Sequence, residues 1–202
     1  MRIRLMNQAP PSDHKHRLRE RLLTSRTAMP STVRRRADRQ ICAHLLRLLE
    51  ERDCVDLAAY VAHRGEPDLM PALHALADAG RRIWLPVVEG RRMHFRRWRP
   101  GVEMVANRYG IPEPAQGPQC PPERLELVLT PLVAWSKNGH RLGMGAGYYD
   151  RTFRFLLDDP DAGPWLVGVG YAMQQIDSLA ADPWDVPLGA VLTERGLEVF
   201  RE

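Results

Sequence analysis

The sequence predicts an α/β fold: a single three-layer domain with a mostly parallel central sheet flanked by helices and preceded by two amphipathic helices. Two observations predict it. Between residues 55 and 88 a short apolar run, a helical pattern and a second apolar run alternate, as in the strand–helix–strand unit of a parallel sheet. The 202 residues are 44% hydrophobic and 27% charged, enough to bury one core. We expect one domain over residues 13–202, after a disordered extension over residues 1–12.

Two amphipathic helices are expected at the start of the chain. Residues 14–29 place leucines among charges, and residues 31–51 repeat this pattern. The apolar positions are Leu18, Leu22 and Leu23 in the first helix, and Val33, Ile41, Leu45, Leu48 and Leu49 in the second. Pro30 separates the two helices, and Ser31 is suited to cap the second one.

Short apolar runs bounded by glycine and proline predict the later helices and strands. Residues 69–80 predict a helix that ends at Gly80, and residues 148–157 predict another. A proline-rich loop is expected over residues 110–122. The predicted strands are residues 55–61, 81–88, 93–99, 125–135, 165–171 and 188–193.

Residues 139–151, GHRLGMGAGYYDR, place four glycines within nine positions. Such a density of glycine favours left-handed turns or close approach of the main chain to a ligand. The segment follows the longest predicted strand and precedes a helix, which is where α/β sheets bind ligands and where free N–H groups attract phosphate. It is neither a Walker A loop, because GxxxxGK[ST] is absent, nor a Rossmann fingerprint, because the third glycine would fall on Tyr148. The pattern predicts a site for a nucleotide phosphate tail.

Charge and cysteine content indicate the kind of partner and the cellular compartment. The net charge of +4 indicates an anionic partner without choosing which one. Cys42, Cys54 and Cys120 lack the paired spacing of a zinc site or a disulfide framework, so we expect a reducing cytoplasm. The sequence contains neither a run of roughly twenty apolar residues nor a signal-peptide pattern, which predicts a cytoplasmic protein without a membrane partner.

Taken with its flanks, the glycine-rich segment resembles the signature of the 5-formyltetrahydrofolate cyclo-ligase family, also called methenyltetrahydrofolate synthetases. Five further segments resemble family motifs, and the six together cover residues 15–196 in the family's order. The five are KHRLR (15–19), GEPDL (65–69), RRIWLPVV (81–88), YGIPEP (109–114) and DPWDVPLGAVLTERG (182–196). The chain departs from the family where relatives often show an aromatic residue and then aspartate, because here Ser136 follows Trp135.

This resemblance implies an enzyme with a three-layer α/β cyclo-ligase-like domain. Its implied reaction is the ATP- and Mg²⁺-dependent cyclisation of 5-formyltetrahydrofolate, with or without a polyglutamate tail, to 5,10-methenyltetrahydrofolate with release of ADP and phosphate. The implied partners are these small molecules, and a monomer without specific nucleic acid is expected.

The resemblance also implies site residues. For ATP these are Lys15, Arg19, Arg141, Gly143, Met144, Gly145, Ala146, Gly147 and Tyr148. For the folate they are Glu66, Met93, Tyr109 and Tyr149. Tyr149 and Arg141 are the implied catalytic residues, and Asp150 and Asp185 the implied Mg²⁺ ligands. Lys15 and Arg19 are four residues apart, so a helix would place them on one face. Without the resemblance, Asp150 and Glu66 could equally be carboxylates that stabilise helix amino termini.

Two other functions fit parts of the sequence. In RRMHFRRWRP, residues 91–100, arginines alternate with Phe95 and Trp98 as on a stacking platform for single-stranded nucleic acid. The period of a half-exposed strand explains the same stretch. An α/β enzyme acting on sugar phosphates or acyl thioesters is the other alternative, because one fold supports many functions.

Overall fold

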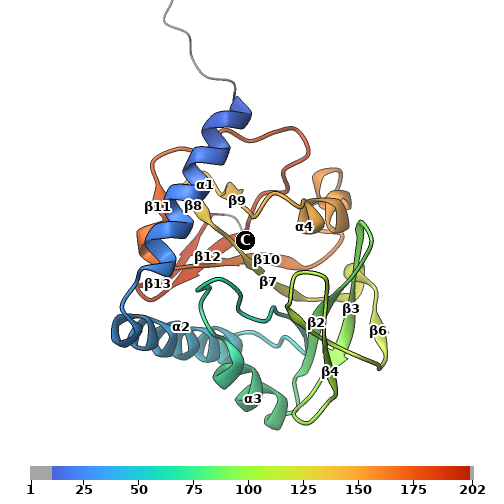
Figure 1. Ribbon diagram of the computed structural model, residues 1–202. Coiled ribbons are helices and arrows are strands. Elements are labelled where there is room, and N and C mark those ends of the chain that lie inside the picture. The colour runs from blue at the N-terminus through green and yellow to red at the C-terminus, as the bar shows by residue number, and fades with distance from the viewer. Residues whose placement is uncertain (1–10, 201–202) are drawn as a thin grey trace, which may run out of the picture.

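The centre of the molecule is an eight-stranded sheet in the order β13-β12-β10-β7-β1-β2-β3-β6, seen in a computed structural model that describes residues 11–200 (Figure 1). The inner five strands pair in parallel, while β13, β3 and β6 add antiparallel edges. In sheet order the strands are Gly196–Val199, Ala190–Thr193, Trp165–Val169, Leu127–Pro131, Asp56–Ala58, Arg82–Glu89, Arg92–Trp98 and Gln119–Cys120. The predicted fold class is confirmed.

The central strands are apolar on both faces because helices or loops cover both. In β7, Leu127 and Leu129 face one core cluster, whereas Val128 faces the other. In β10, Val167 and Leu166 divide in the same way. This alternation is the two-residue period of a strand buried on each side, as parallel sheets require.

Helices α2 (Ser31–Glu51) and α3 (Met70–Asp78) cover one face of the sheet (Figure 1). The other face carries the short helix α4 (Tyr148–Thr152) and a 3₁₀ turn (Arg154–Leu157). The buried stripe of α2 is close to the one predicted and comprises Ala37, Ile41, Cys42, Leu45, Leu48 and Leu49. Val33 is wrong as a core residue because it is 52% exposed. The predicted Ser31 cap is also wrong, since Pro30 holds the N-cap position.

Helix α1 (Pro11–Thr27) does not cover the main sheet but packs on a small one, β11-β8-β9. Its strands are Gln175–Ile176, Ala134–Ser136 and Arg141–Leu142. Leu18 and Leu22 of α1 join Val133, Ala134, Leu142 and Leu179 in a separate apolar cluster. The predicted extension over residues 1–12 falls mainly on residues 1–10, which lie outside the described residues, and α1 begins at Pro11. None of the described helices has the length and apolarity needed to cross a bilayer.

Four further sequence predictions require correction. The strand predicted over residues 125–135 is two strands, because β7 ends at Pro131 and the chain leaves the main sheet to form β8. The helix predicted over residues 148–157 breaks after one turn into the 3₁₀ segment. The strand predicted over residues 55–61 is shorter, because β1 covers only Asp56–Ala58. The loop predicted over residues 110–122 holds β6 and also β5 (Pro112–Pro114), which pairs with β4 (Met104–Ala106).

Candidate functional site

A cleft of about 800 Å³ opens beyond the carboxyl ends of β1 and β7, where Tyr60, Val61, Pro131 and Leu132 line it. This is the usual ligand position in α/β sheets, and the volume suits a small-molecule site. All the site residues that the sequence predicts line this one cleft: Lys15, Arg19, Glu66, Met93, Tyr109, Arg141, Gly143, Met144, Gly145, Ala146, Gly147, Tyr148, Tyr149, Asp150 and Asp185. Segments 170 residues apart therefore meet in one place.

At the glycine-loop end, Lys15 of α1 lies between two carboxylates. Its Nζ is 2.6 Å from Asp182 Oδ2 and 3.3 Å from Asp185 Oδ2. Burial alone would lower the pKa of Lys15, but the hydrogen bond to Asp182 and the charge of Asp185 raise it above its ordinary value. The amine therefore stays charged, and it holds the 182–185 loop against α1.

The glycine loop, residues 143–147, presents main chain to the cleft. Met144, Gly145 and Ala146 are exposed, and Gly145 and Gly147 have φ of +95° and +66°, which favours glycine. Arg19, one turn after Lys15, donates from Nε to the Gly143 carbonyl at 2.8 Å. Gly147 occupies the N-cap position of α4. Free amides and two cations thus share one end of the cleft, an arrangement suited to phosphate.

Asp150 of α4 is held by Arg141, whose side chain is buried. Arg141 Nη2 donates to Asp150 Oδ1 at 2.8 Å, and Nη1 donates to the Val186 carbonyl at 2.7 Å. Asp150 Oδ1 also accepts from the Val186 amide at 3.2 Å. Asp150 therefore lies beside the segment that carries Asp185. The contacts of Arg141 are those of a residue that fixes Asp150, in addition to the phosphate and catalytic roles that the resemblance implies.

Mg²⁺ is compatible with this pair of carboxylates. Among residues 11–200 no group of three or more His, Cys, Asp and Glu side chains is arranged to hold a metal. Mg²⁺ is commonly held by one or two carboxylates together with phosphate oxygens and water. Asp150 and Asp185 are of the residue type that such a site requires, and their role as Mg²⁺ ligands stays a prediction.

The Glu66 end of the cleft is more enclosed. Glu66 is 8% exposed; its Oε2 accepts from the His63 amide at 2.9 Å, and its Oε1 is 3.7 Å from Nη2 of Arg26. Burial raises the pKa of Glu66, while Arg26 and the His63 amide oppose that rise. Nearby, Tyr149 stacks on Phe153 with ring centroids 6.3 Å apart. Burial raises the pKa of Tyr149, so its hydroxyl remains a proton donor at neutral pH.

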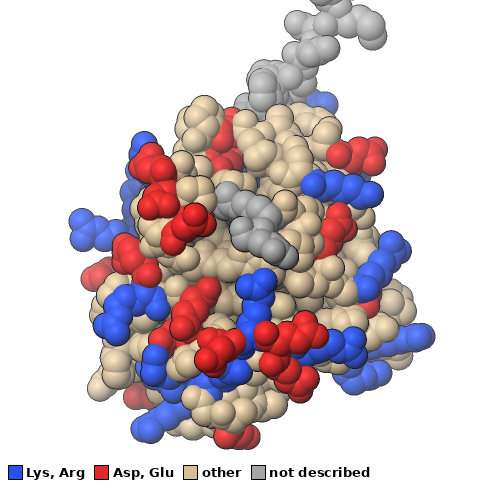
Figure 2. All heavy atoms as spheres, turned by 180° about the vertical axis from the view of Figure 1, so that it is seen from behind, with Lys and Arg blue, Asp and Glu red and all other residues tan. Residues whose placement is uncertain are grey.

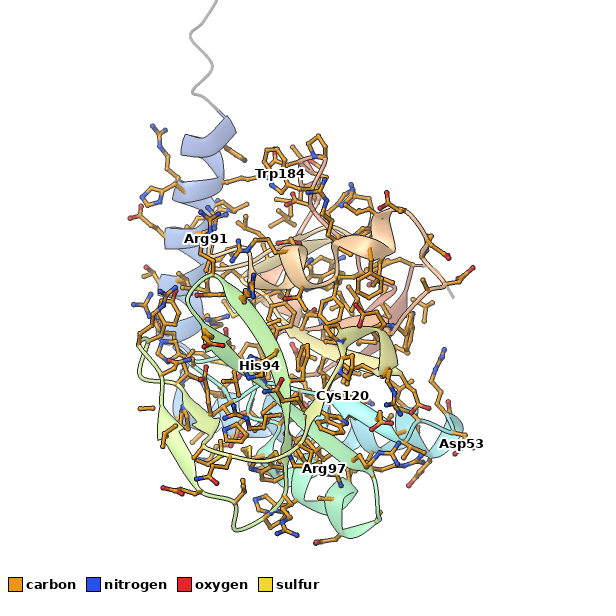
Figure 3. All side chains as sticks on the ribbon, turned by 90° about the vertical axis from the view of Figure 1, so that its right-hand side faces the viewer. Asp53, Arg91, His94, Arg97, Cys120 and Trp184 are labelled. Carbon is orange, nitrogen blue, oxygen red and sulfur yellow. The ribbon has the colours of Figure 1, made fainter. Side chains whose placement is uncertain are left out.

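Tyr109 and Tyr148 meet at the rim between these two ends. Their hydroxyl oxygens are 3.2 Å apart, Arg108 donates to both, and Tyr148 donates to the Gly90 carbonyl at 3.0 Å. The rim thus ties the β4–β5 segment and the β2–β3 hairpin to α4. Figure 3 shows Arg91 at the hairpin tip, with His94 and Arg97 farther along β3. Met93, on the same hairpin, is largely buried and forms part of the apolar wall.

Sequence reasoning missed several residues in or beside the cleft, among them Asp182, Arg26, Arg108 and Trp184. Asp182 was detectable, since it precedes Asp185 by three residues in a proline-flanked turn. Arg26 and Arg108 gave no signal, because arginine is abundant throughout this chain. Trp184 is 60% exposed, lines the cleft and lies in the upper part of Figure 3. The sequence analysis assigned a role only to the aspartate that follows it.

The structure contradicts the stacking platform for nucleic acid, which was the alternative interpretation of residues 91–100. Phe95 is fully buried and Trp98 is 4% exposed, so neither ring can stack on a base. They lie on opposite faces of β3, Phe95 in one core cluster and Trp98 in the other, and both rings are buried because both faces of the sheet are covered here. Over the back of the molecule, basic and acidic side chains of the described residues are interspersed (Figure 2).

The fold and the cleft define an α/β enzyme whose site lies at the carboxyl ends of parallel strands. The model of the 5-formyltetrahydrofolate cyclo-ligase family matches residues 11–194, and the chain belongs to that family. A 5-formyltetrahydrofolate cyclo-ligase from Haemophilus influenzae is 32% identical over 183 residues, which cover 88% of this chain and 96% of that protein.

Two solved structures agree with this assignment. The 5,10-methenyltetrahydrofolate synthetase of Aquifex aeolicus superposes with a TM-score of 0.81 at 31% identity, over 93% of both chains. The enzyme of the same name from Mycoplasma pneumoniae superposes with a TM-score of 0.71 at 26% identity, over 89% of this chain and 98% of that one. Family membership connects the chain with folate-dependent one-carbon chemistry.

Proposed function

We propose that this enzyme uses ATP and Mg²⁺ to cyclise 5-formyltetrahydrofolate to 5,10-methenyltetrahydrofolate, releasing ADP and phosphate. The observation that carries the proposal is that one cleft joins a phosphate-type end, with bare amides and two cations, to a more enclosed end with a buried carboxylate. A reaction between a nucleotide and a second organic substrate needs both ends within reach of each other.

The chemistry proceeds in two steps. The formyl oxygen attacks the γ-phosphorus of ATP, the bond from that phosphorus to the bridging oxygen breaks, and ADP leaves. The resulting imidate phosphate carries a good leaving group on carbon. N10 of the folate then attacks this carbon and loses its proton, and phosphate departs with the former formyl oxygen. The protein mainly positions the reactants and stabilises the charge that develops.

Each side chain has a role in this scheme. Lys15, Arg19 and the glycine-loop amides bind the triphosphate, and Asp150 and Asp185 hold Mg²⁺, which neutralises phosphate charge when bound. Arg141 fixes Asp150 through the contact at 2.8 Å.

At the other end, Glu66 binds the folate, and Met93 and Tyr109 form walls beside it. The protonated hydroxyl of Tyr149 lies in the cleft as a hydrogen-bond donor near the reacting groups. The proposal places the enzyme in the cytoplasm, and its three buried cysteines, all free, are in keeping with a reducing compartment. The proposal also includes a monomer.

One assay tests the function. Protein, ATP, Mg²⁺ and 5-formyltetrahydrofolate are mixed, and the methenyl chromophore and ADP are followed together. We expect the two products in equal amounts, and neither when ATP or Mg²⁺ is omitted. Methenyl product formed without ADP, or ADP formed at the same rate without the folate, would contradict the proposal. An enzyme acting on sugar phosphates or acyl thioesters would form no methenyl product from this folate, so the same assay separates that alternative.

A further inference from the structure

We infer that Arg26 is a positioning residue for Glu66: its guanidinium fixes both the turn that precedes this carboxylate and the carboxylate itself. The inference rests on the proposed role of Glu66 in binding the folate. It concerns a side chain that does not line the cleft and gives no signal in the sequence.

Arg26 is completely buried, which is rare for arginine and requires compensating contacts. It comes from the last turn of α1 and reaches two other parts of the chain. Its Nε donates to the Arg64 carbonyl at 3.1 Å, and its Nη1 donates to the Leu132 carbonyl at 2.9 Å, just beyond the end of β7. Its Nη2 makes no hydrogen bond within the described residues and lies 3.7 Å from Glu66 Oε1. The guanidinium therefore joins α1, the central strand and the Glu66 turn.

The turn before Glu66 needs such a support. Arg64 has φ of +48°, the only positive φ at a residue other than glycine in the described chain, and Gly65 follows with φ of +75°. Consecutive left-handed residues persist only where the surroundings hold them. Arg26 binds the carbonyl of the strained residue, and the turn closes on itself through Glu66 N to His63 O at 3.1 Å. The direction in which Glu66 enters the cleft thus depends on Arg26.

Arg26 also affects the charge of Glu66. Among the described residues, Glu66 interacts electrostatically with Arg26 from α1, Tyr60 after β1 and Tyr149 from α4, and its Oε2 accepts from the amide of His63. Burial raises the pKa of both tyrosines, so they stay neutral over the range in which a carboxylate titrates. Arg26 is therefore the cation that limits the rise of the Glu66 pKa caused by burial.

A first measurement needs no substrate. The melting temperatures of wild type and Glu66→Gln are compared across pH, and again in the Arg26→Met background. Because the folded pKa of Glu66 is raised, its contribution to stability is largest below the unfolded pKa and falls as pH rises through the folded pKa. We expect this fall to be larger, and to extend to higher pH, when Arg26 is replaced. Equal effects of Arg26→Met at every pH, with and without Glu66→Gln, would overturn the inference.

A second measurement uses turnover. We expect Arg26→Met to raise the KM for 5-formyltetrahydrofolate by about tenfold while the KM for ATP changes by less than about twofold. The acid limb of the pH profile of kcat/KM should move to higher pH, and Arg26→Lys should recover part of that shift. In the Glu66→Gln background, Arg26→Met should raise the KM for 5-formyltetrahydrofolate little further. Parallel rises in both KM values would overturn the inference.

The matched control is Arg34→Met. Arg34 donates to the Arg26 and Thr27 carbonyls at 2.8 and 3.2 Å and supports the end of α1, and it makes no hydrogen bond or ion pair to Glu66 within the described residues. It should lower the melting temperature without moving the pH profile. If Arg26→Met does not fold, Arg26→Gln, which removes the charge and keeps an N–H donor, carries both comparisons. If wild type does not convert 5-formyltetrahydrofolate, the proposed function fails while the melting measurement still decides on the Arg26–Glu66 pair.

Discussion

The two ends of the cleft hold their charges in different ways. At the glycine-loop end, Lys15 pairs with Asp182, whose side chain is 42% exposed, and the loop itself is exposed main chain. At the Glu66 end, a buried carboxylate faces a fully buried guanidinium. Exposed pairs contribute little to stability and can be exchanged for a ligand's charges, whereas a buried pair is costly to break. The first end is suited to accepting a mobile polyanion, and the second to holding one fixed geometry.

Asp150→Asn gives the largest expected change at the glycine-loop end. Asparagine keeps an oxygen for Arg141 and for the Val186 amide, so the fold should persist, but the charge that would hold Mg²⁺ is lost. We expect kcat to fall by about 100-fold or more, with a higher Mg²⁺ requirement. Steady-state kinetics across Mg²⁺ concentrations measure this. Asp158→Asn, an exposed carboxylate on the same segment, is the control. An unchanged Mg²⁺ dependence would remove Asp150 from the metal site.

Lys15→Ala tests whether the partly exposed pair of Lys15 and Asp182 is exchanged for a phosphate. We expect the KM for ATP to rise by about tenfold and the melting temperature to change little, because a partly exposed ion pair is worth about 0–1 kcal/mol. Lys137→Ala is the matched control, since Lys137 is the other lysine of this sequence and is exposed. Equal KM values for ATP in the two variants would show that Lys15 serves only to hold the 182–185 loop.

Gly147→Ala tests the main-chain geometry of the glycine loop. At φ of +66° an alanine is strained, and its Cβ would lie 2.7 Å from Arg151 Nη1, which must move. We expect a loss of about 1–2 kcal/mol in the free energy of unfolding and a KM for ATP raised severalfold. Gly143→Ala, at a position without positive φ and with open space for a Cβ, should leave the melting temperature almost unchanged. A similar loss of stability in both variants would contradict the role assigned to the left-handed turn.

Asp56→Asn, distant from both ends, should give the smallest effect. Asp56 accepts from Arg82 Nε at 2.7 Å and Trp84 Nε1 at 2.8 Å, and the hydrogen bond from Arg82 lowers its pKa below the ordinary 3.8. Its contribution to stability is therefore present above the unfolded pKa and lost as pH falls through the folded pKa. We expect a deficit of about 1 kcal/mol at neutral pH that disappears in acid, with kcat unchanged. Urea unfolding at several pH values measures it. A deficit independent of pH would assign the effect to packing.

Sequence patterns predicted the long elements well because each has a strong period. The second helix was predicted at residues 31–51, which are the bounds of α2, and β2 differs from its prediction by one residue at each end. The break between β7 and β8 was not predicted, because the apolar run continues through Leu132 and Val133, which are buried in two different clusters. Burial alone thus could not reveal that the chain leaves one sheet for another.

The site was predictable where a motif marks it and not where a single side chain arrives from a distance. The glycine loop and Asp150 form one continuous pattern, so the sequence identified them together. Asp182 and Arg26 make contacts with segments far apart in the chain, and those contacts depend on the completed fold. Trp184 likewise lines the cleft only once distant segments have come together. The proposed metal, ATP and folate roles of the motif residues remain predictions that the experiments above test.

Helix α1 carries Lys15 and Arg19 for one end of the cleft and Arg26 for the other. At about 100° per residue these three side chains fall within roughly 40° of one another around the helix, and about 1.5 Å per residue separates the first from the last by roughly 16 Å. This spacing is set by regular helix geometry and not by an adaptable loop. Insertion of one residue between 19 and 26 would rotate the buried guanidinium by about 100°. Substitutions can be accepted along this stretch, but its length is fixed.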